Sequence, residues 1–368
     1  MKKHLLLSML LVMFTALSFA QTGKYWSQNH ESIGSMKTDQ SVSRVTFPKT
    51  FQLFRLNLTA IHDELFTVTD NRLRHKTVIT LPNADGQLED FEVNEASNFE
   101  PELQARFPEI RAFSGRGITD KTALLKLSIS PQGIQSMVFR TESANEFIEA
   151  YSADHTVYAV FRSQHQAGQA LPWSCSVQDQ HVAMDLGRQI QLSGRVESSA
   201  GQLKTMRLAQ SVTAEYSNWF GATSAAQVDL VLGGVNATMT RCNGVYELDL
   251  AVHLNLIANT TSVFYYSPAT DPYSPAATGA GGAWNGELQA TLTSVIGEAN
   301  YDIGHLFGAS GGGGNAGCIG CVCTNGSKGS GFTSPADNIP QGDNFDIDYV
   351  VHEVGHQLGA NHTFSMST

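Results

Sequence analysis

Three histidines and one glutamate lie close together near the end of the chain, with a spacing that suits a metal ion and hydrolytic chemistry. His352 and His356 are four residues apart, so in a helix both imidazoles project from one face and can bind the same ion. Glu353 lies beside them as a candidate general base. His362 can reach that ion only if the chain turns sharply. Gly359 permits the turn, because glycine adopts positive φ without a Cβ penalty and commonly ends helices.

The residues before the first histidine predict the helix that must hold it. Asp343 or Asn344 can cap the helix start, and Asp346 and Asp348 suit its positive end. Apolar side chains recur at helical spacing and form one stripe to be buried: Ile347, Val350, Val351, Val354 and Leu358. The opposite side of the same helix carries the first two histidines and the glutamate.

Length, charge and the first residues narrow the class of protein. A chain of 368 residues is long enough for two domains, and a net charge of −11 argues against a nucleic-acid binder, which needs a basic face. Lys2 and Lys3 precede a short apolar run over 5–17 and a small-x-small site at 18–20, which is typical of a signal peptide over 1–20. We expect a secreted, extracellular protein with a mature chain from about Gln21 and no transmembrane segment after signal cleavage.

Residues 21–200 have the pattern of one β-rich unit. Short alternating runs are separated by turn signals, and the predicted strands are Phe51–Leu58, Lys76–Leu81, Leu88–Val93, Ala123–Ile129, Ile134–Phe139 and Thr156–Phe161. The histidines of this half are scattered and form no catalytic cluster. A polar stretch over 193–201 predicts a linker and a protease-sensitive site.

From about residue 201 the pattern changes to alternating strands and helices. Such alternation predicts a mostly parallel sheet covered by helices, so the fold class of this half is α+β or α/β. The predicted strands are Thr205–Ala209, Tyr246–Ile257 and Tyr301–Phe307, and the predicted helices are Val212–Phe220, Ala225–Met239 and Glu287–Ala299.

A glycine-rich stretch over 311–317 precedes the metal motif. It is not a Walker phosphate loop, because 327–329 lacks the Gly-Lys-Ser/Thr that opens a helix. We expect Cys318–Thr324 to form a short strand, whose small neighbours leave a backbone edge open to an extended peptide. A flexible loop is the alternative. The segment assigned as the substrate edge strand is Ala316, Gly317, Cys318, Ile319 and Gly320.

The chain has five cysteines, an odd number for an exported protein: Cys175, Cys242, Cys318, Cys321 and Cys323. At least one is therefore free, bound to metal or paired with a cysteine outside this chain. A zinc knuckle or redox pair at Cys318 and Cys321 is disfavoured, because no second such pair exists and the surroundings are a glycine-rich loop. Cys318 with Cys321, or Cys242 with either of them, stay open as disulfides.

The run His352–His362 resembles the extended zinc signature of the metzincin peptidases. The wider run 345–364 is similar to bacterial members of the reprolysin, or adamalysin-like, group. Upstream segments occur in that group's order, so the similarity covers about 203–364: Glu215–Tyr216, Asn243–Val252, Tyr301–His305 and the glycine-rich stretch. Pro101–Leu103 and Phe107–Arg111 look like the pro-region found ahead of such domains.

This resemblance implies a metzincin-like upper subdomain over 201–368, with a twisted, mostly parallel sheet, an antiparallel edge strand and an active-site helix, behind a pro-region over 21–200. It implies one catalytic Zn²⁺ on the three histidines, an open position for water, and Glu353 as general base. The implied function is hydrolysis of protein or peptide substrates by an enzyme made as a zymogen. Ca²⁺ stays open, because no residue pattern derives a site for it, and so does the oligomeric state.

Two features depart from the family pattern. Thr363 stands where eukaryotic adamalysins usually carry Asp, which fits the bacterial branch better. The methionine-containing turn expected beneath the zinc is not found before Thr368, because Met366 is too close to His362 to provide it. We therefore expect a C-terminally truncated domain, in which Cys323 lacks the partner it has in relatives, and whose own activity is an open question.

Cys175 lies in the predicted pro-region, and we hypothesise that it is a cysteine switch whose thiolate fills the open zinc position until the pro-region is cut away. A buried thiol or a disulfide partner is the alternative. Two functions remain in view: a secreted zinc endopeptidase, and a non-catalytic exported binding or structural module whose zinc only stabilises the fold. Glu353 favours the peptidase, because a structural site needs no carboxylate next to its first ligand.

Overall fold

The computed structural model describes residues 23–70, 75–163, 175–178 and 201–362. The predicted signal peptide and nearly all of the predicted linker lie outside these ranges. Within them, no helix combines the length and the apolar character needed to cross a membrane.

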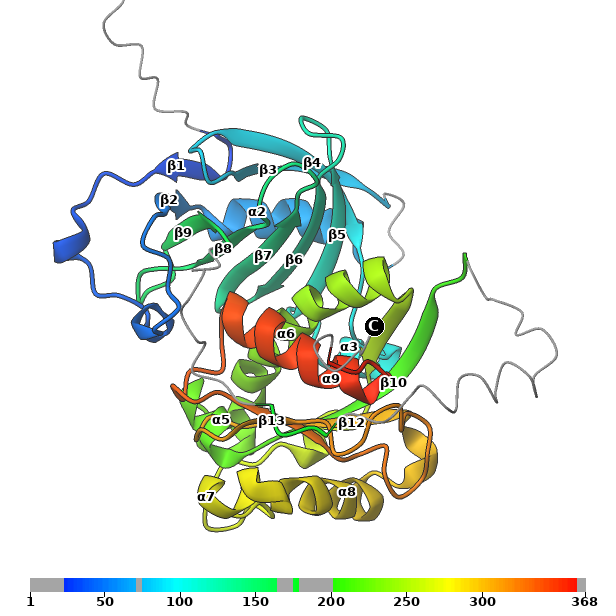
Figure 1. Ribbon diagram of the computed structural model, residues 1–368. Helices are drawn as coiled ribbons and strands as arrows, with labels where there is room; N and C mark the ends of the chain where they lie inside the picture. Colours follow the sequence, from blue (N-terminus) through cyan, green and yellow to red (C-terminus); the bar gives the residue numbers. More distant parts are fainter. Residues whose placement is uncertain (1–22, 71–74, 164–174, 179–200, 363–368) are drawn as a thin grey trace, which may run out of the picture.

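The N-terminal half is a nine-stranded antiparallel sheet (Figure 1) with the order β1-β2-β9-β8-β7-β6-β5-β4-β3. Its strands are β1 (Trp26–Gln28), β2 (Gln52–Leu56), β3 (Thr77–Pro82), β4 (Leu88–Glu95), β5 (Arg111–Gly117), β6 (Leu124–Ser130), β7 (Gly133–Phe139), β8 (Glu146–Ala150) and β9 (Val157–Arg162). Helix α2 (Leu58–Leu65) packs on one face through Ile61 and Leu65, and α3 (Pro101–Arg106) joins β4 to β5. Each of the six predicted strands corresponds to one of these strands.

The sequence patterns did not predict β1, β5 and β8. Strand β8 has no polar alternation, because all five of its residues are buried, including Glu146 and Glu149. Both carboxylates can be buried because arginines pair with them: Arg140 bonds Glu146, and Arg241 bonds Glu149. These partners come from other elements, so the strand itself gives no sign of them.

The C-terminal half is a five-stranded sheet with the order β11-β10-β12-β14-β13, parallel except for the antiparallel pair β13 and β14. Its strands are β10 (Lys204–Val212), β11 (Val252–Leu256), β12 (Ile303–Phe307), β13 (Gly313–Asn315) and β14 (Gly331–Ser334). Its helices are α5 (Ala214–Trp219), α6 (Val228–Asp249), α7 (Ala276–Thr278), α8 (Trp284–Val295), the π-helical η8 (Asn344–Val350) and α9 (Val351–Gln357).

Two layers of helices cover the C-terminal sheet. Along β10, Leu208 packs into the core shared with α6 and α9, whereas Ala209 packs into the core shared with α8. Such alternation is what the pleat of a strand produces. Figure 1 shows α8 on one side of this sheet and α6 with α9 on the other, so α9 lies against the sheet face that meets the N-terminal half.

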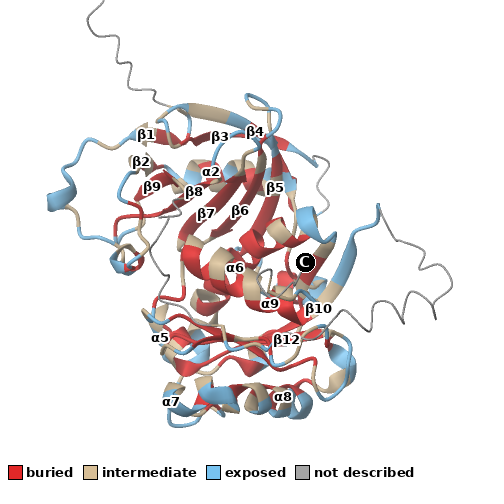
Figure 2. Cartoon of the chain, viewed as in Figure 1, coloured by how far each residue is buried: buried red, intermediate tan, exposed pale blue. Residues whose placement is uncertain are grey.

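Helix α6 is ten residues longer at its C-terminal end than predicted, and the predicted strand Tyr246–Ile257 is wrong over its first part. Tyr246 belongs to the helix and is buried, and the chain reverses at Ala251, with φ of 52°, before β11 begins. The helix lies between two sheets and is buried on most sides (Figure 2). An all-round buried helix has no single apolar stripe, so its end could not be read from periodicity.

Candidate metal centre

Four side chains from two distant parts of the chain converge on one point. The Nε2 atom of His356 lies 2.9 Å from the Nε2 atom of His352 and 3.2 Å from that of His362. The ligand atoms of these histidines and of Cys175 all lie within 4.8 Å of one another. Burial, followed by the neighbouring imidazoles, lowers the pKa of His352 to about 4. Neutral imidazole nitrogens and a sulfur, gathered this closely, are a donor set that fits a metal ion.

The end of α9 sets the direction of two of these rings. Nδ1 of His356 is 2.6 Å from the Ala360 carbonyl oxygen, so that nitrogen donates a proton and Nε2 is left as the metal-binding atom. Gly359 follows the helix with φ of 117°, in the region that favours glycine, and the chain then returns with His362 towards the other rings. The loop residue Gly320 donates its N–H to the His356 carbonyl at 3.0 Å and secures this end.

Glu353 lies beside the cluster and is completely buried. Neither carboxylate oxygen has a partner at hydrogen-bonding geometry among the described residues. Burial raises the pKa of Glu353 to about 8, and the nearby Cys175 thiol opposes this rise. Gly314 makes room for the carboxyl group, since a Cβ at that position would lie 2.4 Å from Oε1. A buried carboxyl with no partner other than the Cys175 thiol is costly to the fold and is typical of a functional site.

The comparison with protein families agrees with this geometry. Residues 202–368 match the model of the metallo-peptidase family M12B, reprolysin-like. This part of the chain is a reprolysin-like metallopeptidase domain. None of the curated proteins compared with the chain matches it.

The contact between Cys175 and the reprolysin-like domain runs along β13. Cys175 forms a parallel bridge with Gly314, and Ser176 donates its N–H to the Gly314 carbonyl at 3.1 Å. Asn315 donates from Nδ2 to the Ser176 hydroxyl at 2.8 Å. This pairing places the Cys175 sulfur 3.7 Å from Nε2 of His356, and the Val177 N–H donates to that sulfur. A short segment from before the domain thus occupies the open edge of β13.

The predicted substrate edge lies next to this strand rather than in it. The edge strand is Gly313–Asn315, whereas Ala316–Gly320 forms turns, and the expected strand Cys318–Thr324 is absent. Positive φ values explain the difference: Gly317 and Gly320 have φ of 72° and 70°, and Cys323 has φ of 61°. Three such residues so close together break the extended run, whereas β13 has positive φ only at its first residue, Gly313. The glycine-rich stretch that looked too flexible for a strand supplies the edge instead.

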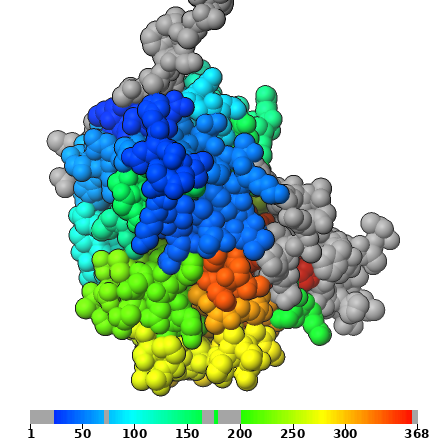
Figure 3. Space-filling model, turned by 90° about the vertical axis from the view of Figure 1, so that its left-hand side faces the viewer, coloured from blue at the N-terminus to red at the C-terminus, as the bar shows by residue number. Residues whose placement is uncertain are grey.

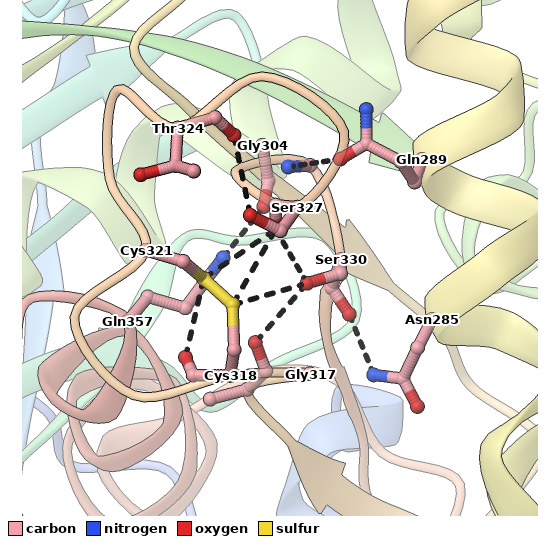
Figure 4. Close-up of a disulfide and its surroundings, with 12 residues drawn as sticks. Asn285, Gln289, Gly304, Gly317, Cys318, Cys321, Thr324, Ser327, Ser330 and Gln357 are labelled. Carbon is pink, nitrogen blue, oxygen red and sulfur yellow. Dashed lines mark hydrogen bonds between the residues drawn. A yellow bond between two sulfur atoms is a disulfide. The ribbon is translucent and has the colours of Figure 1, made fainter.

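The Cys318–Cys321 disulfide lies in this turn segment (Figure 4), so of the pairings left open by the sequence the local one is found. Cys242 is buried in α6 and donates its S–H to the Asp346 carbonyl, and Cys323 is exposed. The disulfide closes the loop that carries Gly320. It therefore supports the end of α9 and the turn towards the third histidine.

A buried polar relay holds α9 against the sheet and was missed by sequence reasoning. Nδ1 of His305 on β12 lies 2.7 Å from Oε1 of Gln357, and Nε2 lies 2.8 Å from the Thr333 hydroxyl on β14. Gln357 also donates from Nε2 to the Gly304 carbonyl at 2.9 Å, as Figure 4 shows. Burial lowers the pKa of His305 to about 4, so the ring is neutral. Single polar residues far apart in sequence gave no signal of this contact.

Helix α6 supports η8 and α9, the helix that carries His352 and His356, from the other side. The Tyr246 hydroxyl donates to the Val350 carbonyl at 3.3 Å, and Arg241 donates to Asp346 at 2.9 Å. Asp346 is buried, and burial raises its pKa to about 6. Helix α9, which carries His352 and His356, is therefore held from two sides, and the Ala360 carbonyl after the helix fixes the His356 ring.

Proposed function

We propose that the chain is the zymogen of a secreted, zinc-dependent endopeptidase. The observation that carries this proposal is the convergence of three imidazole nitrogens next to a buried carboxyl group. The match to the reprolysin-like family supports a peptidase, and protein or peptide chains are its substrates. The expected signal peptide lies outside the described residues, and sequencing the N-terminus of the exported protein tests it: a start near Gln21 is expected.

Each polar side chain at the centre has a distinct part in the proposed reaction. His352, His356 and His362 would hold Zn²⁺, whose chemistry is to polarise the scissile carbonyl and to lower the pKa of water. Glu353, as a carboxylate, accepts a proton from the attacking water at Oε1 or Oε2 and passes it to the leaving amine. The backbone of β13 holds the extended substrate, because its open edge can pair with a further strand.

The same contacts support latency. Cys175 offers a fourth ligand atom to the histidine cluster, and Ser176 pairs with Gly314 on the edge strand. A substrate needs both places, so the segment that holds Cys175 must leave before a peptide can bind. A structural zinc site is the alternative function, and it gives no reason for the buried Glu353 beside the ligands.

Substitutions in the full chain test the mechanism. We expect Cys175→Ala to cleave a generic protein substrate while the wild-type chain stays latent, and the double variant Cys175→Ala with Glu353→Gln to bind the same amount of zinc without cleaving. Cleavage that survives in the double variant, or that a zinc chelator leaves unaffected, would sink the mechanism.

A spectroscopic test examines latency separately. The Co²⁺-loaded wild-type chain should show thiolate-to-cobalt charge-transfer absorption that Cys175→Ala lacks. If both proteins give the same spectrum and the same latency, Cys175 is not the switch, whatever the activity.

A further inference from the structure

We propose that residues 23–163 are a lasting structural subunit of the peptidase, which stays bound to the reprolysin-like domain after the segment between them is cut. The proposal rests on the proposed function only in assuming that the zymogen is cut there. The binding surface consists of the side of α6 that faces the nine-stranded sheet, the outer edge of β11, and Ile347 of η8. Its partner is the nine-stranded sheet of the same chain.

Helix α6 is shaped to receive that sheet. Fifteen of its 22 residues are buried. Two of its glycines lie where strands of the N-terminal half approach most closely: a Cβ at Gly244 would lie 2.8 Å from the Phe139 ring, and one at Gly233 would lie 2.9 Å from the side chain of Gln132. A larger residue at Gly244 would press on the Phe139 ring, so the two surfaces are closely packed there, whereas at Gly233 the flexible end of Gln132 could give way.

Main-chain hydrogen bonds join the two halves at β11. Phe99 forms a parallel bridge with Leu256, and the Leu256 N–H donates to the Asn98 carbonyl at 2.7 Å. The Glu100 N–H donates to the Leu256 carbonyl at 2.9 Å. The N-terminal half therefore pairs with the edge strand β11 through one parallel bridge and partly covers that edge.

Asn98 extends this contact into α6. It is buried, and its Nδ2 donates to Oδ1 of Asn236 at 3.0 Å and to the Thr240 hydroxyl at 2.8 Å, while its Oδ1 accepts from Asn243 at 2.9 Å. Asn236 in turn donates to the Arg111 carbonyl at 3.0 Å. The polar residues of α6 are thus paired by groups of the N-terminal half.

Charged and apolar contacts continue the interface to the active-site helix. Glu149 of β8 accepts from Arg44 of its own half at 2.7 Å and from Arg241 of α6 at 2.9 Å, and Arg44 also donates to Asp343 at 3.1 Å. Ile347 of η8 packs on an apolar cluster of the N-terminal half. In the core on the other side, Phe99, Leu103 and Ile110 pack with residues of α6 and β11. Figure 3 shows the N-terminal residues, in blue, directly against the green and orange residues of the domain.

Latency and anchoring use different contacts. The Cys175 segment pairs with β13 and the histidine cluster, whereas the sheet binds α6 and η8, and residues 98–100 bind β11. The segment at the metal centre can therefore leave while the sheet remains in place. The active enzyme would then consist of two fragments held together without a covalent bond.

A cut chain tests the proposal. Residues 166–171 are replaced by the recognition sequence of a site-specific protease in the full chain carrying Glu353→Gln. After cleavage the N-terminal fragment lacks the Cys175 segment, so its retention reports on the sheet interface. We expect both fragments to elute together in size-exclusion chromatography and to separate only in denaturant. Separate elution in native buffer would overturn the proposal.

Two variants and one control locate the interface. Glu149→Gln and Asn98→Ala should each speed dissociation of the cut complex by at least about 30-fold, because they leave buried polar partners unpaired across the interface. Asn94→Ala removes an exposed side chain of the same half and should change the rate less than about twofold. If Glu149→Gln fails to fold, Asn98→Ala carries the test. Unchanged rates in the variants that fold would place the binding elsewhere. Since no step requires catalysis, a stable complex here, combined with no cleavage by the Cys175→Ala chain that keeps Glu353, would overturn the proposed function alone.

Discussion

Replacing Gly314 with alanine should move Glu353 without touching a metal ligand. The added Cβ would lie 2.4 Å from Oε1, 2.5 Å from Cγ and 2.6 Å from Cδ of Glu353, whereas ordinary contact begins at 3.4 Å. The carboxyl group, or β13, must therefore shift by about 1 Å. A misplacement of about 1 Å in a catalytic group can lower the rate by about 100-fold, which corresponds to about 2.7 kcal/mol in the activation free energy. We expect kcat/KM to fall by that factor.

The assay uses the full chain with Cys175→Ala, so that latency does not mask the effect. Cleavage of a fluorogenic peptide gives kcat/KM, and elemental analysis gives the zinc content, which should stay unchanged. Gly286→Ala is the matched control, because that glycine lies in α8 with open space around its Cβ position. A kcat/KM within about threefold of the parent, with zinc retained, would refute the role of Gly314 in placing Glu353.

Three further predictions concern the supports of the site. Gly359→Ala should lower metal affinity by about 10-fold, because a side chain at that φ costs about 1–3 kcal/mol and the turn carries the third histidine. Competition with a chelator measures the affinity, and an unchanged value would contradict the prediction. Asp39→Asn removes the partner that raises the pKa of His155. That pKa is higher in the folded state, so the stabilisation is fully present below the unfolded value of about 6.5 and is lost as pH rises through the folded pKa. Denaturant melts of wild type and variant should accordingly converge at high pH, and a constant difference would speak against the pairing. Cys318→Ser with Cys321→Ser should lower the free energy of unfolding by about 2 kcal/mol, the value for so short a closed loop, and a reductant should bring the wild type to the same level.

The sequence predicted the parts of the site that depend on local spacing. The histidines and Glu353 occupy one short segment, and helical geometry alone brings His352 and His356 together. The supports depend on contacts between distant segments: His305 and Gln357 are 52 residues apart, and neither belongs to a recognisable pattern. The fold divides in the same way. Strands with local apolar alternation were predicted well, because that pattern lies within the strand itself.

Where several elements pack together, local sequence patterns gave wrong predictions of secondary structure. Helix α6 is buried on most sides, so the end of its apolar pattern did not mark the end of the helix. The short strand expected at Cys318–Thr324 is a disulfide-closed turn, because positive φ at Gly320 and Cys323 is a backbone property that apolar content does not reveal.

The position of α6 between two sheets has a consequence for the order of folding. Synthesis proceeds from the N-terminus, so the nine strands leave the ribosome before α6 does. We expect the antiparallel sheet to form first, since its neighbours are mostly consecutive in sequence, and then to serve as the surface on which α6 becomes helical. The helix that supports the metal centre from one side would thus acquire its shape from residues made well before it, and the active-site helix would be last to find its place.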